Sequence, residues 1–236
     1  MGRVNAHQMV ETVYGDLHRA ILDRRLRPGN KLREQALGEL FGVSRTTIRA
    51  ALQRLEADGL VTIEPNKGAS VSLPSVSEVG ELFHVRRIVE IGIAAQLCAA
   101  SSHDFLATLR HHVELEHAAI AAKDYRRAIE LLGNFHILLA EATGNRILVD
   151  FFKGIVSRTS LVVSAFDNSS HAGCRGDEHA ELIKLIAARD VAGAIRCTEK
   201  HLHEIETAIT EQARRVEADY HPLQHLFGEG EPSPSR

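Results

Sequence analysis

The sequence predicts a mainly α-helical protein, with an N-terminal winged helix-turn-helix and a C-terminal antiparallel six-helix bundle. Two short helical segments around a glycine turn, followed by two β-rich runs, predict the winged helix-turn-helix in residues 1–73. Helical periodicity without a convincing strand predicts the bundle in residues 78–218. Residues 74–77 are the expected linker, and the composition of residues 219–236 predicts a partly disordered tail.

The first helix is expected over residues 8–25, because Pro28 and Gly29 interrupt the helical pattern just beyond them. The next helix is expected over residues 33–41 and ends at Gly42, a residue suited to a left-handed C-cap. The apolar side chains that these helices should bury are Val10, Val13, Leu17, Ile21 and Leu22 in the first, and Ala36, Leu37, Leu40 and Phe41 in the second.

Ser44 occupies the expected N-cap position of the second helix of the helix-turn-helix. One face of this helix carries Ile48, Leu52 and Leu55 at the i, i+4, i+7 spacing of a buried stripe. The opposite face carries side chains that donate hydrogen bonds. They are Arg45, Thr46, Arg49 and Gln53. This polar face is therefore the candidate for base contacts in a DNA major groove.

The runs LVTIE and ASVSL flank the turn sequence Pro65-Asn66-Lys67-Gly68, which predicts a β-hairpin wing. After it, Pro74 and Ser77 mark the best domain boundary and the start of the bundle. Six helices follow by periodicity. Their expected ranges are 78–101, 104–122, 124–143, 146–168, 176–189 and 191–218.

Charge is divided unevenly along the 236 residues. Residues 1–73 hold 11 Lys and Arg against 8 Asp and Glu, whereas the remaining 163 hold 17 against 23. A basic first part on an acidic body suits phosphate contacts in the first part only. Three cysteines at unrelated spacings form no disulfide framework, and no apolar run is long enough for a membrane span or a signal peptide. A cytoplasmic protein is therefore expected.

The sequence resembles the GntR family of bacterial transcription regulators, in the FadR-type branch with an all-helical FCD effector domain. In the N-terminal part the resemblance covers roughly residues 10–73, including LREQALGELFGVSRTTIRAALQRLEADGLV and the wing tip. The six helices after the wing look more like the VanR-type subgroup. The C-terminal motifs are VRRIVE near residues 85–90, Phe135-His136 with EATGN after it, EHAELIKLIAARD at 178–190, and His201-Leu202.

The resemblance implies a homodimer that binds double-stranded DNA at a palindromic operator. Arg45 or Arg49 could grip a guanine bidentately, a contact worth about 1–3 kcal/mol of discrimination between bases. For both arginines the alternative is a solvated face with acidic partners. The full set of expected DNA-binding residues is Arg33, Ser44, Arg45, Thr46, Thr47, Arg49, Lys67 and Gly68.

The resemblance also implies a metal site in the bundle, made by His136, His179 and His201 on three different helices. Neutral imidazoles suit Zn²⁺ or Ni²⁺, and three nitrogens leave positions open for water or an effector carboxylate. The Asp that the family usually supplies one turn before the first of these histidines is Leu132 here. Three core histidines that hydrogen-bond to one another, to water or to the effector remain the alternative to a metal site.

The bundle contains further candidates for binding the effector or a metal. Arg86 matches a family arginine that faces the effector cavity, and its guanidinium suits an anionic ligand, although an ion pair with Glu90 is equally compatible. Arg158 is a second candidate for the effector, and Cys197, one turn before His201, is a further conceivable ligand. His111, His112 and His117 are expected on a polar surface.

These features predict a ligand-responsive DNA-binding regulator, most often a repressor in this family, whose helical domain binds a small organic acid. The alternatives are a metal-dependent enzyme or a metabolite-binding protein built on the bundle. No nucleophile motif, Gly-rich phosphate loop or general base with a partner supports the enzyme.

Overall fold

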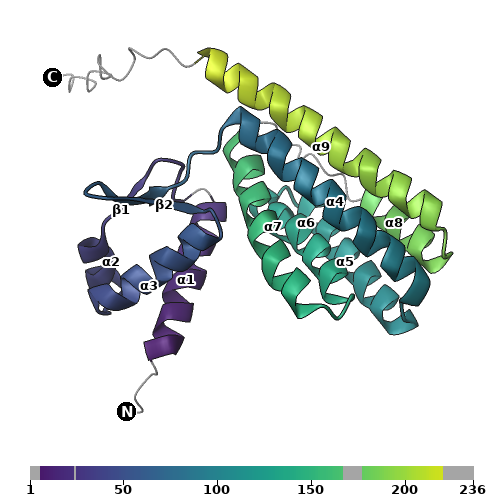
Figure 1. Ribbon diagram of the computed structural model, residues 1–236, viewed down its shortest axis with the longest axis horizontal. Coiled ribbons are helices and arrows are strands. Elements are labelled where there is room, and N and C mark those ends of the chain that lie inside the picture. Colours follow the sequence, from purple (N-terminus) through teal and green to yellow (C-terminus); the bar gives the residue numbers. More distant parts are fainter. Residues whose placement is uncertain (1–5, 24, 167–176, 220–236) are drawn as a thin grey trace.

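The computed structural model describes residues 6–23, 25–166 and 177–219. Figure 1 shows two parts side by side: a small α/β unit at the N-terminus and a larger all-helical bundle. This arrangement confirms the predicted fold class. In the described part of the chain, no helix is long and apolar enough to cross a membrane.

The N-terminal unit packs three helices against a three-stranded antiparallel sheet of order β1-β3-β2. Two of its strands, β2 and β3, are the predicted wing, with Glu64 paired with Gly68 beside the turn. The two-residue strand β1 was not predicted. The elements are α1 (Ala6–Leu22), β1 (Lys31–Leu32), α2 (Glu34–Phe41), α3 (Arg45–Ala57), β2 (Val61–Glu64) and β3 (Gly68–Val71).

The core of this unit joins one face of α1, one face of α3 and the sheet. Its fully buried side chains include Val13, Leu17, Ile21, Ile48, Leu52 and Leu55, as the helical spacing predicted. The expected burial on α2 is wrong in part. Ala36 is exposed and Leu40 is 76% exposed, because the apolar residues of α2 that pack against the core are Leu37 and Phe41.

The bundle contains six helices in the described residues, close to the predicted ranges. Its first helix begins one residue after Ser75, whose hydroxyl accepts the Glu78 N–H at 3.2 Å, so the cap lies two residues before the expected Ser77. In Figure 1, α4 and α9 run along each other over the other helices. The helices are α4 (Val76–Ala100), α5 (His103–Ala121), α6 (Tyr125–Glu141), α7 (Arg146–Phe166), α8 (Asp177–Ala187) and α9 (Val191–Asp219).

Helix α7 joins the two units. Leu161 of α7 is buried in the core of the N-terminal unit, and Ser164 donates a hydrogen bond to the Leu22 carbonyl at 3.3 Å. His18 of α1 lies 3.2 Å from the Ser157 hydroxyl. The winged helix is therefore docked on the same helix that, on its other side, lines the interior of the bundle.

Candidate DNA interface and effector site

The start of α3 is held in place by the turn that precedes it. Gly42 has φ +64°, the left-handed conformation predicted for a C-cap. The Ser44 hydroxyl accepts the Thr47 N–H at 3.2 Å and lies 2.9 Å from the Thr47 hydroxyl. These two side chains thus cap the helix, and Thr46 beside them is exposed.

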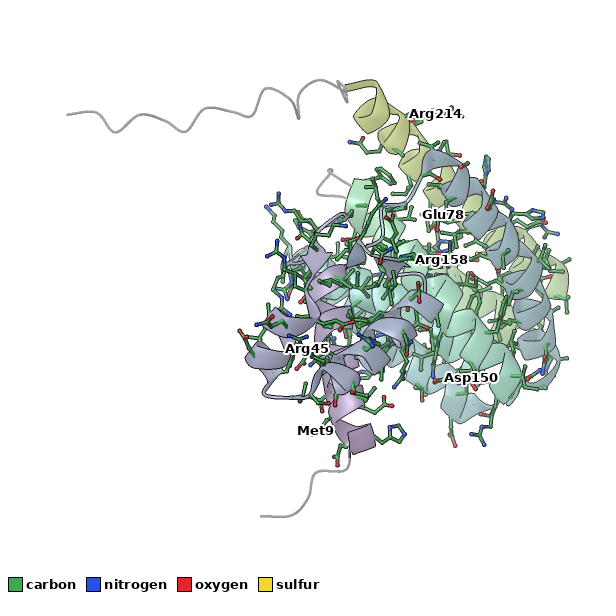
Figure 2. All side chains as sticks on the ribbon, turned by 60° about the vertical axis from the view of Figure 1, so that its left-hand side comes forward. Met9, Arg45, Glu78, Asp150, Arg158 and Arg214 are labelled. Atoms are coloured by element: carbon green, nitrogen blue, oxygen red, sulfur yellow. The ribbon has the colours of Figure 1, made fainter. Side chains whose placement is uncertain are left out.

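Arg45 and Arg49 lie on the exposed face of α3, and Figure 2 places Arg45 on the winged helix away from the bundle. Both are held by α2. Arg45 donates to the Gln35 side-chain oxygen at 3.2 Å, and Arg49 donates to both carboxylate oxygens of Glu34, at 3.0 and 2.9 Å. The hydrogen bond from Arg49 lowers the pKa of Glu34. The acidic partner that sequence reasoning kept as the alternative is therefore present at Arg49.

The wing tip is a turn in which two residues have left-handed backbone. Asn66 and Gly68 have φ +64° and +77°, and Lys67 forms an ion pair with Glu64 at 2.7 Å. Arg33 occupies the exposed N-cap position of α2. A groove of about 190 Å³ lies between α3 and the wing, and its lining includes both Arg49 and Gly68. Of the predicted DNA-binding residues, the structure thus brings Arg49 and Gly68 together at this groove.

Inside the bundle, α6, α8 and α9 bring His136, His179 and His201 together. Each offers one ligand atom, and these atoms all lie within 4.8 Å of one another. The Nε2 atoms of His136 and His201 are 3.5 Å apart. Phe135 stacks on His179 with ring centroids 3.8 Å apart, which limits rotation of that imidazole. The three side chains are nearly inaccessible to solvent, with residue exposures of 5%, 1% and 5%.

Each of the three imidazoles has its Nδ1 beside a carboxylate. His136 lies 2.7 Å from Glu90, His179 lies 2.9 Å from Glu116, and His201 lies 2.8 Å from Glu178. A neutral imidazole that donates its Nδ1 proton to a carboxylate keeps an Nε2 lone pair for a metal. The pairs therefore favour the ring form that ligates.

Burial and pairing adjust the charges of these groups. Burial lowers the pKa of His136 to about 3, so its ring is neutral at pH 7. Burial also disfavours the charged form of Glu90, yet Arg86 and His136 outweigh it and hold the pKa of that carboxyl well below its usual range. Burial raises the pKa of Glu116 to about 7, and the hydrogen bond from His201 lowers that of Glu178.

The donor set fits a divalent cation. Tetrahedral ligands about 2.0–2.1 Å from Zn²⁺ lie about 3.4 Å apart, close to the separation of the Nε2 atoms of His136 and His201. Cys197 is not part of this set. Its thiol donates to the Glu178 carbonyl at 3.7 Å, and burial raises its pKa, which disfavours a thiolate.

A cavity of about 50 Å³ lies beside His136 between α6 and α7. Leu132, one helical turn before His136, forms part of its wall at the position where the resemblance would place an Asp. Arg86 also lines the cavity. Its Nε donates to Glu90 at 2.7 Å, whereas its Nη2 is buried and has no hydrogen-bond partner among the described residues. The expected ion pair with Glu90 and a donor for an anionic ligand are thus both present on one guanidinium.

Arg158 does not line this cavity. It pairs with Glu78 at the junction of the two units, where Figure 2 shows both side chains, and it packs against Gly59 after α3. Its placement gives no support to the expected contact with an effector. His112 also differs from expectation: its side chain is 12% exposed and its Nε2 lies 2.9 Å from the Leu131 carbonyl.

Sequence reasoning missed the acidic partners of the histidines. Glu116 is fully buried, on the helix whose histidines 111, 112 and 117 were expected on a polar surface. Its position could have been recognised, because Leu109, Val113 and Glu116 follow the i, i+4, i+7 spacing of a buried face. Glu178 stands directly before His179 but contacts His201, a pairing that depends on how α8 and α9 pack.

Two family models match the chain. The model of bacterial regulatory proteins of the gntR family matches residues 9–71, and the FCD domain model matches residues 81–204. The repressor RspR of Escherichia coli K12 is 25% identical over 211 residues, 89% of this chain and 92% of that protein. The regulator LutR of Bacillus subtilis is 27% identical over 215 residues, 78% of this chain and 94% of LutR.

Solved structures agree in fold. The Escherichia coli protein McbR/YncC superposes with a TM-score of 0.76 at 20% identity, covering 86% of this chain and 98% of that one. A GntR regulator from Rhodococcus sp. RHA1 gives a TM-score of 0.68 at 25% identity, with 90% and 99% covered. The matches favour a regulator over an enzyme built on the bundle. The chain belongs to the GntR family, as a transcription regulator whose winged helix precedes an FCD effector-binding domain.

Proposed function

We propose that this regulator is a repressor, which binds a palindromic operator as a homodimer in the cytoplasm and releases it when a small carboxylate enters the FCD domain. Residues 1–73 would bind DNA, 78–218 would bind the effector, and 74–77 would connect them. The observation that carries the proposal is the exposed face of α3, which presents Arg45 and Arg49, with Arg49 beside the wing. RspR, a relative over most of the chain, is named as a repressor.

Arg45 is the first base-reading candidate, because its partner Gln35 is neutral and a guanine would replace it without leaving a charge behind. Arg49 would have to leave Glu34 before it reaches DNA. Thr46, Thr47 and Ser44 would contact phosphates near the helix start, together with Lys67 and Arg33. Gly68 would let the wing backbone approach the minor groove.

The test is a gel-shift titration on an operator selected from random double-stranded DNA. Arg45→Ala should weaken specific binding about 5- to 150-fold, from the 1–3 kcal/mol of a bidentate base contact. Arg110→Ala, which removes the same charge from an exposed position on α5, should leave the affinity unchanged. Equal affinity of the Arg45 variant and the parent protein would remove Arg45 from the interface.

Dimerisation has a candidate surface on α4 and α7. The two helices run antiparallel, because Glu78 pairs with Arg158 near one end and Gln96 contacts the Thr143 carbonyl near the other. This register brings three exposed apolar side chains onto adjoining turns. They are Ile88 (64% exposed), Ile147 (84%) and Phe151 (55%). An apolar face of this kind on two neighbouring helices is typical of a protein interface.

Sedimentation analysis tests this surface. Phe151→Asp should convert the dimer to a monomer and weaken operator binding, since one winged helix reads too few base pairs. Val191→Asp, at another exposed apolar position, should leave the dimer intact. A Phe151 variant that stays dimeric would exclude this face.

Effector binding is proposed to act through α7. One side of α7 lines the cavity through Val156, Thr159 and Ser160, while Arg158 packs against Gly59 at the end of α3. A ligand that shifts α7 would therefore change how α3 is held. It favours release only if it binds the DNA-incompetent arrangement more tightly.

We further propose that His136, His179 and His201 hold Zn²⁺ or Ni²⁺, with Leu132 leaving one position without a protein ligand. The bound cation would supply positive charge for the effector carboxylate. The convergence of three carboxylate-paired imidazoles supports this assignment. Metal analysis of protein purified without added metal tests it.

A further inference from the structure

We infer that the effector of this protein is a short monocarboxylate with an apolar tail, rather than a dicarboxylate or a polyhydroxy acid. The inference rests on the proposed function, because it assigns a ligand class to the proposed effector cavity. It follows from three features of that cavity: one unpaired buried donor, an apolar wall that includes Leu132, and a small volume.

The polar end of the cavity is formed by Arg86 and His136. Nη2 of Arg86 is buried without a partner, although Nε of the same guanidinium is already bound to Glu90. A buried donor left unpaired costs free energy, and a carboxylate oxygen would satisfy it with a charge-assisted hydrogen bond. We therefore place the anionic group of the ligand at this end.

The rest of the cavity is largely aliphatic. Ile129, Leu132 and Gly133 lie on the same face of α6 as His136 and line the cavity with it. Ile129 is seven residues, or two helical turns, before the histidine. Two hydroxyls also line this part: Thr159 already donates its proton to the Ile155 carbonyl at 2.9 Å, and Ser160 is the other. The aliphatic side chains of the wall are Ile129, Leu132, Val156, Val163 and Ile205.

A second carboxylate would lie against this aliphatic wall. Apart from the hydroxyls of Thr159 and Ser160 it would find no polar side chain there among the described residues, and a buried charge without a cationic partner is strongly disfavoured, so dicarboxylates are excluded by desolvation rather than by size alone. Leu132, which is buried in this wall, therefore suits an alkyl chain rather than a second charged group.

The volume sets the length of the tail. About 50 Å³ accommodates about three to five water-sized positions. That space matches an acid of about five non-hydrogen atoms, such as propionate. Each methylene placed against the wall should tighten binding about fourfold, from about 0.8 kcal/mol per buried CH₂.

Calorimetric titration of the full-length, Zn²⁺-loaded protein tests the ligand class. Acetate, propionate and malonate are the probes, because malonate replaces the methyl group of propionate with a second carboxylate. Propionate should bind about fourfold more tightly than acetate and at least tenfold more tightly than malonate. Malonate binding as tight as propionate, or no binding of any of the three, would overturn the inference.

Variants locate the binding in this cavity. Leu132→Ala should move the preferred acid from propionate to pentanoate, because the shortened side chain adds room at the apolar wall. Leu131→Ala is the matched control: Leu131 is equally aliphatic, buried and on the same helix, but it does not line the cavity. The same change of preference in both variants would contradict the assignment.

Arg86→Lys keeps a positive charge beside Glu90 but replaces the planar guanidinium with a single nitrogen, so no atom remains at the Nη2 position. It should weaken propionate binding at least tenfold, and unchanged binding would overturn the role of Arg86. Gel shifts with the selected operator on the same preparations separate the two levels of the proposal. If the parent protein binds the operator specifically but does not respond to the acids, the ligand class is refuted and the regulator function stands. If the parent protein shows no specific DNA binding, the proposed function is refuted.

Discussion

The contact between Gly59 and Arg158 provides a direct test of the link between the DNA-binding unit and the bundle. Gly59 has φ +72°, and a Cβ placed there would lie 2.4 Å from Cδ of Arg158 and 2.6 Å from its Nε. Gly59→Ala should therefore strain the backbone and also push Arg158 away from Glu78. The first effect is local, whereas the second acts between the two units.

The two effects have separable magnitudes. Left-handed backbone costs a non-glycine residue about 1–2 kcal/mol. Displacing Arg158 adds the loss of a partly exposed ion pair, 40% and 27% exposed, which solvent screening limits to about 0–1 kcal/mol. We expect Gly59→Ala to lower the free energy of unfolding by about 1–3 kcal/mol.

Gly29→Ala is the matched control, because Gly29 has φ +82° and nothing lies within 4 Å of its Cβ position. Gly29→Ala should lower the free energy of unfolding only by the cost of the left-handed backbone. Urea denaturation of both variants, each alone and combined with Arg158→Ala, measures the difference. In the Arg158→Ala background the two glycine substitutions should cost the same.

The functional readout is the response of operator binding to the effector acid. Gly59→Ala should retain operator binding but show a smaller release by propionate, whereas Gly29→Ala should respond like the parent protein. If the two variants matched in stability and in response, both with and without Arg158, the contact would not transmit the signal through α7.

Three further predictions concern other residues. Glu34→Gln should raise operator affinity a few-fold in gel shifts, because it frees Arg49, and the gain should vanish in an Arg49→Ala background. Burial lowers the pKa of His18, so below about pH 6.5 the folded state binds fewer protons than the unfolded state. The melting temperature of the parent protein should therefore fall as the pH drops from 7 to 5, and that of His18→Gln should fall less steeply. If the melting temperature of His18→Gln fell with pH as steeply as that of the parent protein, His18 would not be the origin of the pH dependence. His179→Ala should abolish bound Zn²⁺ and its thermal stabilisation in elemental analysis and melting, while His111→Ala, at an exposed position, should lose neither.

Local sequence determined most of the secondary structure. Ser44 caps α3 and Gly42 ends α2 because side-chain hydrogen bonding and left-handed backbone are properties of single residues. The buried stripe of Ile48, Leu52 and Leu55 follows from helical spacing alone. The same reasoning wrongly predicted that Leu40 is buried, because periodicity predicts which residues share a face and not whether another element covers that face.

The chemistry of the effector site depended on tertiary structure. The sequence by itself placed histidines 136, 179 and 201 on three helices, but only the packing of α4, α5 and α8 shows that Glu90, Glu116 and Glu178 orient them. The same packing turns Arg158 to the junction with Gly59 and leaves one Arg86 nitrogen unpaired in an aliphatic cavity. Caps and stripes are decided within a few residues of chain, whereas the partner of a buried charge comes from segments far apart in sequence, which meet only when the bundle forms.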